Sequence, residues 1–263
     1  MKNIRHDSFW HHMNGFGVGA TWTRYDSDDI SAKKTSDFLN DFVKLHPDWV
    51  PFRMYSSIKG ALTSFYSEIP TLPELRKIIE EGLDKYAYGY GSHIFFENVV
   101  KQTDQRKLVQ FNLTCGAYDR QSNGLSIKFP PYNEEAKHIT TKEVYIVSLK
   151  LIIKHWNPYR GSIGIPFFMI EDYKSANDMA DKVPEVSWFN YFSAQLGELP
   201  QLPDWVIITP VDGLGNYIQV SEDLPDKTNE NELHNIITKV YELSELIKPW
   251  IKSKWELIIS SEL

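Results

Sequence analysis

The chain has 263 residues and a mass of 30.6 kDa, which is enough for one large domain or two small ones. Hydrophobic residues make up 42% of the chain and charged residues 24%, which excludes wholesale disorder. The net charge of −7 argues against a general phosphate-binding protein, because such proteins are usually basic. The single cysteine, Cys115, excludes an internal disulfide.

No targeting or membrane segment is evident in the sequence. Residues 1–17 lack the apolar core of a signal peptide. No uncharged apolar run approaches the roughly 20 residues that cross a bilayer. We therefore expect a cytoplasmic protein with no membrane partner.

The first part of the chain combines a strand with two helices. Residues 18–25 are rich in Thr, Trp and Tyr, as in a strand. Asp28, Asp29 and Ser31 offer N-cap chemistry for a helix, and apolar residues recur at helical spacing from 38 to 45, until Pro47. Thr71 and Glu74 form a capping box that predicts a second helix.

An antiparallel hairpin follows. Apolar and polar residues alternate over 109–115 and again over 125–129, with the turn sequence DRQSNG between them. Such alternation predicts two strands with one buried face. Because Cys115 falls on the apolar side, it is expected to be a core residue rather than a nucleophile.

The second part repeats this mixture. Thr140 and Glu143 form a capping box for a helix that ends at Asn157-Pro158, and Asn229 and Glu232 open a last helix expected to end at Pro249. The predicted strands between these helices are 162–170, 188–193, 205–209 and 215–221. The last of these is expected to pair with the strand before it, across the turn VDGLG.

These elements predict an α+β fold with an antiparallel or mixed sheet flanked by helices, forming a single domain over residues 1–263. The segments DWVPFRMY (48–55) and HWNPYRGSI (155–163) echo each other, since each follows a helix and leads to a strand. A duplication into two α/β halves, 17–130 and 131–250, would produce this echo, and so would chance.

Motifs for chemistry are weak. His11 and His12 are adjacent and would point to opposite faces of a strand, so no metal site is expected. Gly15, Gly17 and Gly19 precede the first predicted strand, whereas a dinucleotide motif follows one, so they are expected to be a flexible lead-in and no cofactor is predicted. No nucleophile motif occurs, and no catalytic residue is proposed. A hydrolase built from scattered carboxylates stays the alternative.

The charge distribution carries more information. Residues 170–235 hold 13 acidic residues against three basic ones, a local net charge of −10. The stretch also contains aromatic residues, and aromatic anchors within an acidic rim are typical of protein interfaces. A solvated surface would explain the same charges equally well. We expect partner binding by Glu171, Asp172, Asp178, Asp181, Glu185, Trp188 and Tyr191.

An ordered series of motifs extends over roughly residues 17–250. It comprises ATWTRY (20–25), FLNDFVKLHPDW (38–49), FNLTCGAY (111–118), LSIKFP (125–130), SWFNYFSAQLGELPQLP (187–203) and DGLGNYI (212–218). In content, order and spacing the series resembles the immunity protein 52 family of bacterial polymorphic-toxin systems. Trp22, Arg24, Trp49, Gly116, Trp188, Tyr191 and Gly215 match recurring positions, where burial in the fold is the usual reason for large rings.

The resemblance implies an antidote rather than an enzyme. Its partner would be a cognate toxin, a basic nuclease with a restriction-endonuclease-like fold, delivered by contact-dependent secretion such as the type VI system. An acidic protein could cover the positive groove of such a nuclease without binding nucleic acid itself. A homodimer is compatible with the aromatic content, and an interaction module unrelated to toxins is a third hypothesis.

Overall fold

A computed structural model describes residues 16–24, 26–45, 49, 52–56, 62–66, 68–82, 92–98, 108–116, 123–130, 134–164, 186–226 and 229–261. The first part contains β1 (Gly17–Trp22), α2 (Asp28–Val43), β2 (Phe52–Ser56), β3 (Leu62–Tyr66), α3 (Leu72–Gly82), β4 (Ser92–Glu97), β5 (Gln110–Cys115) and β6 (Asn123–Lys128). The second part contains α4 (Lys142–Trp156), β7 (Arg160–Gly164), β8 (Phe189–Ser193), the short helix η3 (Ala194–Leu196), β9 (Ile207–Val211), β10 (Gly215–Gln219) and α6 (Glu230–Ser261).

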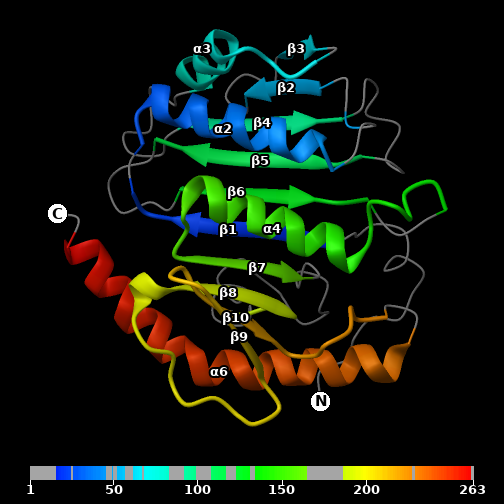
Figure 1. The fold of residues 1–263 in the computed structure, drawn as a ribbon, viewed down its shortest axis with the longest axis vertical. Helices are drawn as coiled ribbons and strands as arrows, with labels where there is room; N and C mark the ends of the chain where they lie inside the picture. The colour runs from blue at the N-terminus through cyan, green and yellow to red at the C-terminus, as the bar shows by residue number, and fades with distance from the viewer. Residues whose placement is uncertain are drawn as a thin grey trace, which may run out of the picture.

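The strands form one sheet in the order β3-β2-β4-β5-β6-β1-β7-β8-β10-β9 (Figure 1). Every pairing between neighbours is antiparallel. The α+β prediction is therefore confirmed, and the sheet is antiparallel rather than mixed. The predicted hairpins β5–β6 and β9–β10 pair as expected.

Both halves of the echoed motif connect a helix to a strand, α2 to β2 and α4 to β7. The two halves meet inside the sheet, where β1 pairs with β7 from Gly17 opposite Gly164 to Thr21 opposite Arg160. The duplication of 17–130 and 131–250 stays a prediction.

Local hydrogen bonds define where the helices begin. Ser27, rather than Asp28, Asp29 or Ser31, caps α2, and its side chain accepts from the Ile30 N–H. Thr141 rather than Thr140 caps α4, because the Thr140 hydroxyl donates to the Ala136 carbonyl instead. The boxes at the other two helices are as predicted: the Thr71 N–H donates to Glu74 Oε2 at 2.7 Å, and the Glu232 N–H donates to Asn229 Oδ1 at 3.2 Å.

Two other boundary predictions were wrong. Gly17 and Gly19 lie within β1 rather than before it, because the backbone of β1 pairs with β6 and β7 from residue 17 onward. The last helix does not end at Pro249 but continues to Ser261. A proline removes one helical hydrogen bond, yet Ile247 and Ile251 on either side are buried, so packing holds the helix together across it.

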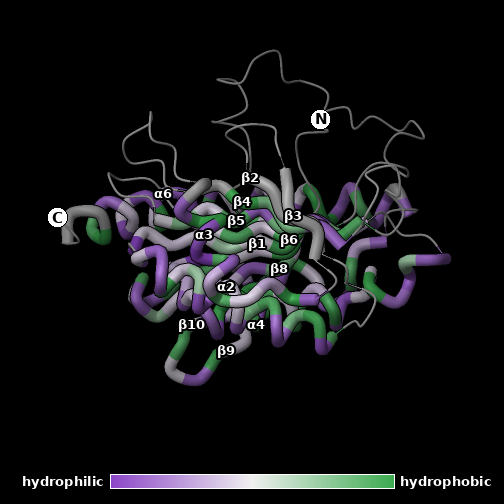
Figure 2. Tube along the Cα trace, turned by 90° about the horizontal axis from the view of Figure 1, so that it is seen from above, coloured by the Kyte–Doolittle hydropathy of each residue, from purple (hydrophilic) through white to green (hydrophobic). Residues whose placement is uncertain are grey.

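Helices α2 and α4 cover one face of the sheet. Figure 1 shows both in front of the strands, and Figure 2 shows them from above on the same side. Their aromatic rings meet those of the strands: Trp156 stacks on Trp22 with ring centroids 5.6 Å apart, and Phe42 meets Phe111 edge-on at 4.6 Å. Burial of large rings is the main source of stability at such contacts.

Helix α6 packs on the opposite face at the other end of the sheet. Trp250 of α6 contacts Phe192 of β8 edge-on, with centroids 5.5 Å apart, whereas the neighbouring Tyr191 packs against Tyr217. Successive strand residues point to opposite faces, so β8 is covered on both sides, and all five of its residues are buried. None of the described helices, α6 included, has the length and apolar character that crossing a membrane requires.

A polar cluster joins the C-terminal ends of α2 and α4. Asp41 Oδ2 accepts from Lys154 Nζ at 2.6 Å and lies 3.1 Å from His155 Nε2, and Lys44 Nζ bonds Asp41 Oδ1 at 2.9 Å. These hydrogen bonds, first that of Lys154, hold the pKa of Asp41 well below its usual range. Burial lowers the pKa of His155 despite the carboxylate beside it, so the folded state favours the neutral ring.

We predict that His155 makes the protein less stable in mild acid. The unfolded chain, with an ordinary histidine pKa of about 6.5, binds this proton more readily than the folded chain, so stability falls as the pH falls through that region. Urea unfolding at pH 7.5 and pH 5.5 should show a larger loss for the wild type than for His155→Gln. The lowered pKa of Asp41 adds its own loss only at more acidic pH. Equal losses in the two proteins would contradict the prediction.

Candidate interaction surface

The predicted partner-binding residues divide into two groups. Glu171, Asp172, Asp178, Asp181 and Glu185 lie outside the described residues. Trp188 and Tyr191 are described, and both are buried, with 2% and 0% of their surface exposed. In this structure the two rings therefore belong to the core, and neither is presented to a partner.

Both buried rings make hydrogen bonds that fix the chain around β10. The Trp188 indole N–H donates to the Ser221 carbonyl and lies 3.1 Å from the Ser221 hydroxyl as well. The Tyr191 hydroxyl donates to the Leu214 carbonyl at 2.8 Å, and burial raises the pKa of that hydroxyl. A buried polar group needs such a partner. Trp188 is therefore hydrogen-bonded to the chain after β10, and Tyr191 is hydrogen-bonded to the turn before β10.

The turn between β9 and β10 is held in one conformation. Gly213, at φ +68°, occupies the third position of a turn that closes with the Leu214 N–H donating to the Val211 carbonyl at 2.9 Å. The Ala194 N–H adds a second donor, at 2.8 Å, to the Leu214 carbonyl. A Cβ at Gly215 would lie 2.1 Å from the Phe192 carbonyl oxygen, so only glycine fits there.

The exposed charges that residues 186–226 contribute are acidic, while Lys239 of α6 lies over the Trp205 ring with its Nζ 5.6 Å from the ring centroid. Residues 186–226 contain no lysine, arginine or histidine. Their acidic side chains are all exposed: Glu198, Asp204, Asp212, Glu222, Asp223 and Asp226. The described part of the predicted acidic stretch therefore has its charge on the outside, as a surface for a basic partner requires.

Apolar side chains are exposed next to these acids, which the sequence analysis missed. Ile207 and Ile208 of β9 are 38% and 46% exposed, and Leu214 of the turn is 41% exposed. Alternation in WVIIT predicts that one of two neighbouring isoleucines is buried. The signal that could have located them is the end position of β9 in the sheet, which local periodicity does not reveal.

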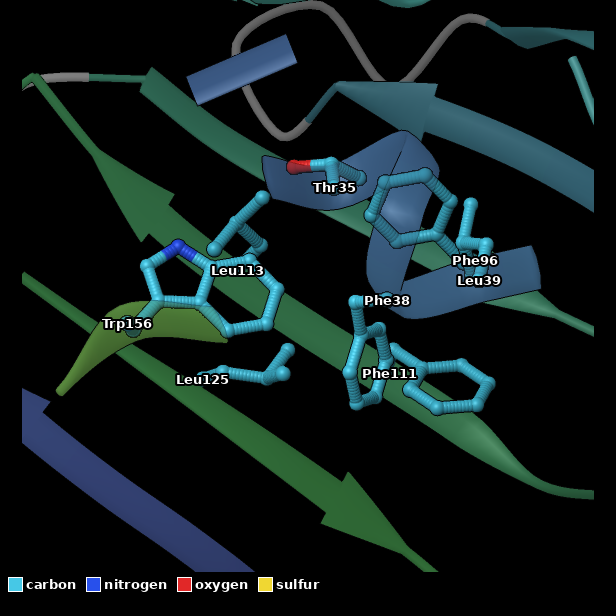
Figure 3. A pocket seen from close by; sticks show the side chains of 8 residues that line it. All are labelled: Thr35, Phe38, Leu39, Phe96, Phe111, Leu113, Leu125 and Trp156. Atoms are coloured by element: carbon cyan, nitrogen blue, oxygen red, sulfur yellow. The ribbon is translucent and has the colours of Figure 1, made fainter. Parts of the chain in front are cut away.

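Two kinds of chemical site, a nucleophile and a metal site, place requirements on the described residues. Burial raises the pKa of the Cys115 thiol to about 12, which suits a core residue. Within the described ranges, no group of three His, Cys, Asp or Glu side chains could hold a metal ion. Figure 3 shows a pocket lined by apolar side chains and Thr35, whose hydroxyl donates to the Ser31 carbonyl within α2. The pocket has no room for a water molecule.

Comparisons with known proteins cover most of the chain. The family model described as "Immunity protein 52" matches residues 14–248. The T6SS protein PA0821 of Pseudomonas aeruginosa is a solved structure with 14% sequence identity and a TM-score of 0.49 to this chain. That match covers 86% of this chain and 73% of the other. No curated protein matches the sequence.

The structural role of Tyr191 can be tested by removing its hydroxyl. Tyr191→Phe keeps the packed ring and deletes the bond to the Leu214 carbonyl, so we expect the free energy of unfolding to fall by about 1 kcal/mol. Urea denaturation measures this loss, and Tyr145→Phe provides a control at another buried tyrosine. If Tyr191→Phe unfolds at the wild-type urea midpoint, the hydroxyl does not hold the turn.

Proposed function

The chain belongs to the immunity protein 52 family and has an immunity role, and on that premise we propose that it binds a cognate protein toxin and blocks it by occlusion. The observation that carries this proposal is the family match over residues 14–248, which includes every described strand and most of α6. Neutralisation by binding needs a complementary surface and no chemical step, so the protein would act without substrate turnover.

The proposed toxin is a basic nuclease with a restriction-endonuclease-like fold. A nuclease needs a positive surface for phosphates. The six exposed carboxylates of residues 186–226, with no basic side chain among them, would compete for such a surface. Electrostatic complementarity of this kind speeds association and fixes the register of the complex.

The acidic residues of 170–185 belong to the same proposal. Glu171, Asp172, Asp178, Asp181 and Glu185 precede the described acidic surface in sequence and carry charge of the same sign. Because both rings are buried, Trp188 and Tyr191 would support the binding surface from the core rather than contact the toxin. The complex would form in the cytoplasm, where a nuclease delivered by a type VI or related secretion system meets its nucleic acid.

Neutralisation can be tested directly in cells. Expression of the toxin encoded by the adjacent gene should abolish growth, and co-expression of this chain should restore it, because the bound toxin cannot reach its substrate. Purified chain and an inactive toxin variant should co-elute in size-exclusion chromatography. Absence of both rescue and a complex would end the proposal. Rescue by an unrelated acidic protein of similar charge would show that the effect is not specific.

The acidic segment has a separate test. Reversal of Asp172, Asp178 and Asp181 to lysine should slow association with the toxin by about tenfold or more at low salt, with a smaller difference at high salt, because screening removes steering. Stopped-flow association at two ionic strengths measures both effects. Reversal of Glu68, Glu134 and Glu143, which are acidic residues outside the stretch, provides a control with equal net charge. An unchanged rate and salt slope would remove the segment from the interface.

A further inference from the structure

Strand β9 is the end strand of the sheet and is exposed along almost its whole length. It follows β10 at the end of the strand order, and residues 207–210 are all exposed. Ile207 and Ile208 are neighbours, so they point to opposite faces of the strand, and Leu214 is exposed in the adjoining turn. Three large apolar side chains exposed on one end strand and its turn offer apolar contacts to a partner that covers this edge from both faces.

The backbone of β9 is also available on one side. Only β10 pairs with it among the described strands, with Ile208 opposite Ile218 and Thr209 opposite Tyr217. Edge strands present unpaired backbone groups to other chains, and proteins commonly limit this with proline. Pro210 lies in β9 and has no N–H to offer. Because Pro210 cannot donate, backbone pairing along β9 is incomplete, and a partner must also gain contacts with the exposed apolar side chains.

The charges around β9 select the partner. Asp204 lies three residues before Ile207, and Asp212 directly follows Val211, so an exposed acid stands near each end of the strand. Neither acid forms an ion pair with another described residue within 4 Å. Two copies of this surface would bring like charges together, which opposes a dimer through β9 and favours a basic protein.

We propose that the β9 edge, defined as Ile207, Ile208 and Leu214 with Asp204 and Asp212, is the docking surface for the cognate toxin. This inference rests on the proposed function and deepens it. Ile207 and Ile208 supply apolar contacts on the two faces of the edge, Leu214 supplies one at the turn, and the two acids pair with basic side chains of the toxin. Because the Leu214 carbonyl is fixed by two hydrogen bonds, little conformational freedom is lost when the toxin binds.

The test compares two isoleucines of nearly equal exposure. Ile208 is 46% exposed at the β9 edge, and Ile30 is 48% exposed on α2, which lies over the other half of the sheet (Figure 1). Ile208→Arg should weaken binding to the inactive adjacent-gene toxin at least tenfold, since it replaces an apolar contact with a cation that faces the basic partner. Ile30→Arg should change affinity by less than twofold. Isothermal titration calorimetry gives both values.

Two further variants keep the test independent of folding and of one position. Leu214→Arg should repeat the loss. Asp204→Lys with Asp212→Lys should slow association and flatten its salt dependence relative to Glu68→Lys with Glu134→Lys, which changes the net charge equally. Urea midpoints near that of the wild type establish that each variant is folded.

The outcomes separate the surface from the function. Wild-type binding that survives Ile208→Arg and Leu214→Arg unchanged would overturn the β9 surface and leave the proposed function standing. Failure of the wild-type chain to bind or neutralise the toxin would overturn both. Self-association of the chain that Ile208→Arg abolishes in analytical ultracentrifugation would assign the edge to a second copy and overturn the inference.

Discussion

The hydrogen bonds to the Leu214 carbonyl hold together the part of the protein on which this account depends. One donor is the buried Tyr191 hydroxyl and the other is the Ala194 N–H, both at 2.8 Å. They join the turn of β9–β10 to β8, an inner strand covered on both faces. Gly215 permits the close approach, since a Cβ there would overlap the Phe192 carbonyl. The exposed edge is therefore attached to a strand whose five residues are all buried.

One short stretch of sequence contributes both to the core and to the charged surface. Residues 186–226 supply the aromatic rings that β8 and β10 bury, and the same residues supply only acidic charges to the surface. Aromatic burial provides stability, whereas exposed carboxylates add little to stability and raise association rates with basic partners. An immunity protein needs both properties, because it must form a complex quickly and keep its binding surface in shape beforehand.

Much of the fold could be predicted from local pattern. Alternation located β5 and β6, and the pair Thr71 and Glu74 located α3. Strands β3 and β4 were not predicted from the sequence. In β4 the run of Ile94, Phe95 and Phe96 has no alternation, and its strand character comes from pairing with β2 and β5. The end predicted for α6 at Pro249 was wrong for a similar reason, because tertiary contacts of Trp250 and Ile251 outweigh the hydrogen bond that the proline removes.

The candidate site also has features that depend on tertiary structure and could not be predicted from local sequence pattern. Its acidic character is visible in composition, but the exposure of Ile207 and Ile208 depends on where β9 falls in the sheet. The strand also begins two residues later than the apolar pattern indicates, because the Val206 N–H bonds the Pro203 carbonyl and turns the chain first. Trp188 and Tyr191 were predicted as partner contacts on composition alone, whereas long-range packing of Trp188 against Phe16 and of Tyr191 against Tyr217 buries them.

The central claim is that the chain works by covering a toxin one molecule at a time. Titration of a fixed concentration of active toxin with increasing amounts of the protein, at concentrations far above the dissociation constant, tests this most directly. The account predicts a linear fall in nuclease activity that reaches its end at a fixed equivalence point of about one chain per toxin. Complete loss of toxin activity at a small fraction of an equivalent would mean that the chain turns its partner over, and would contradict the account.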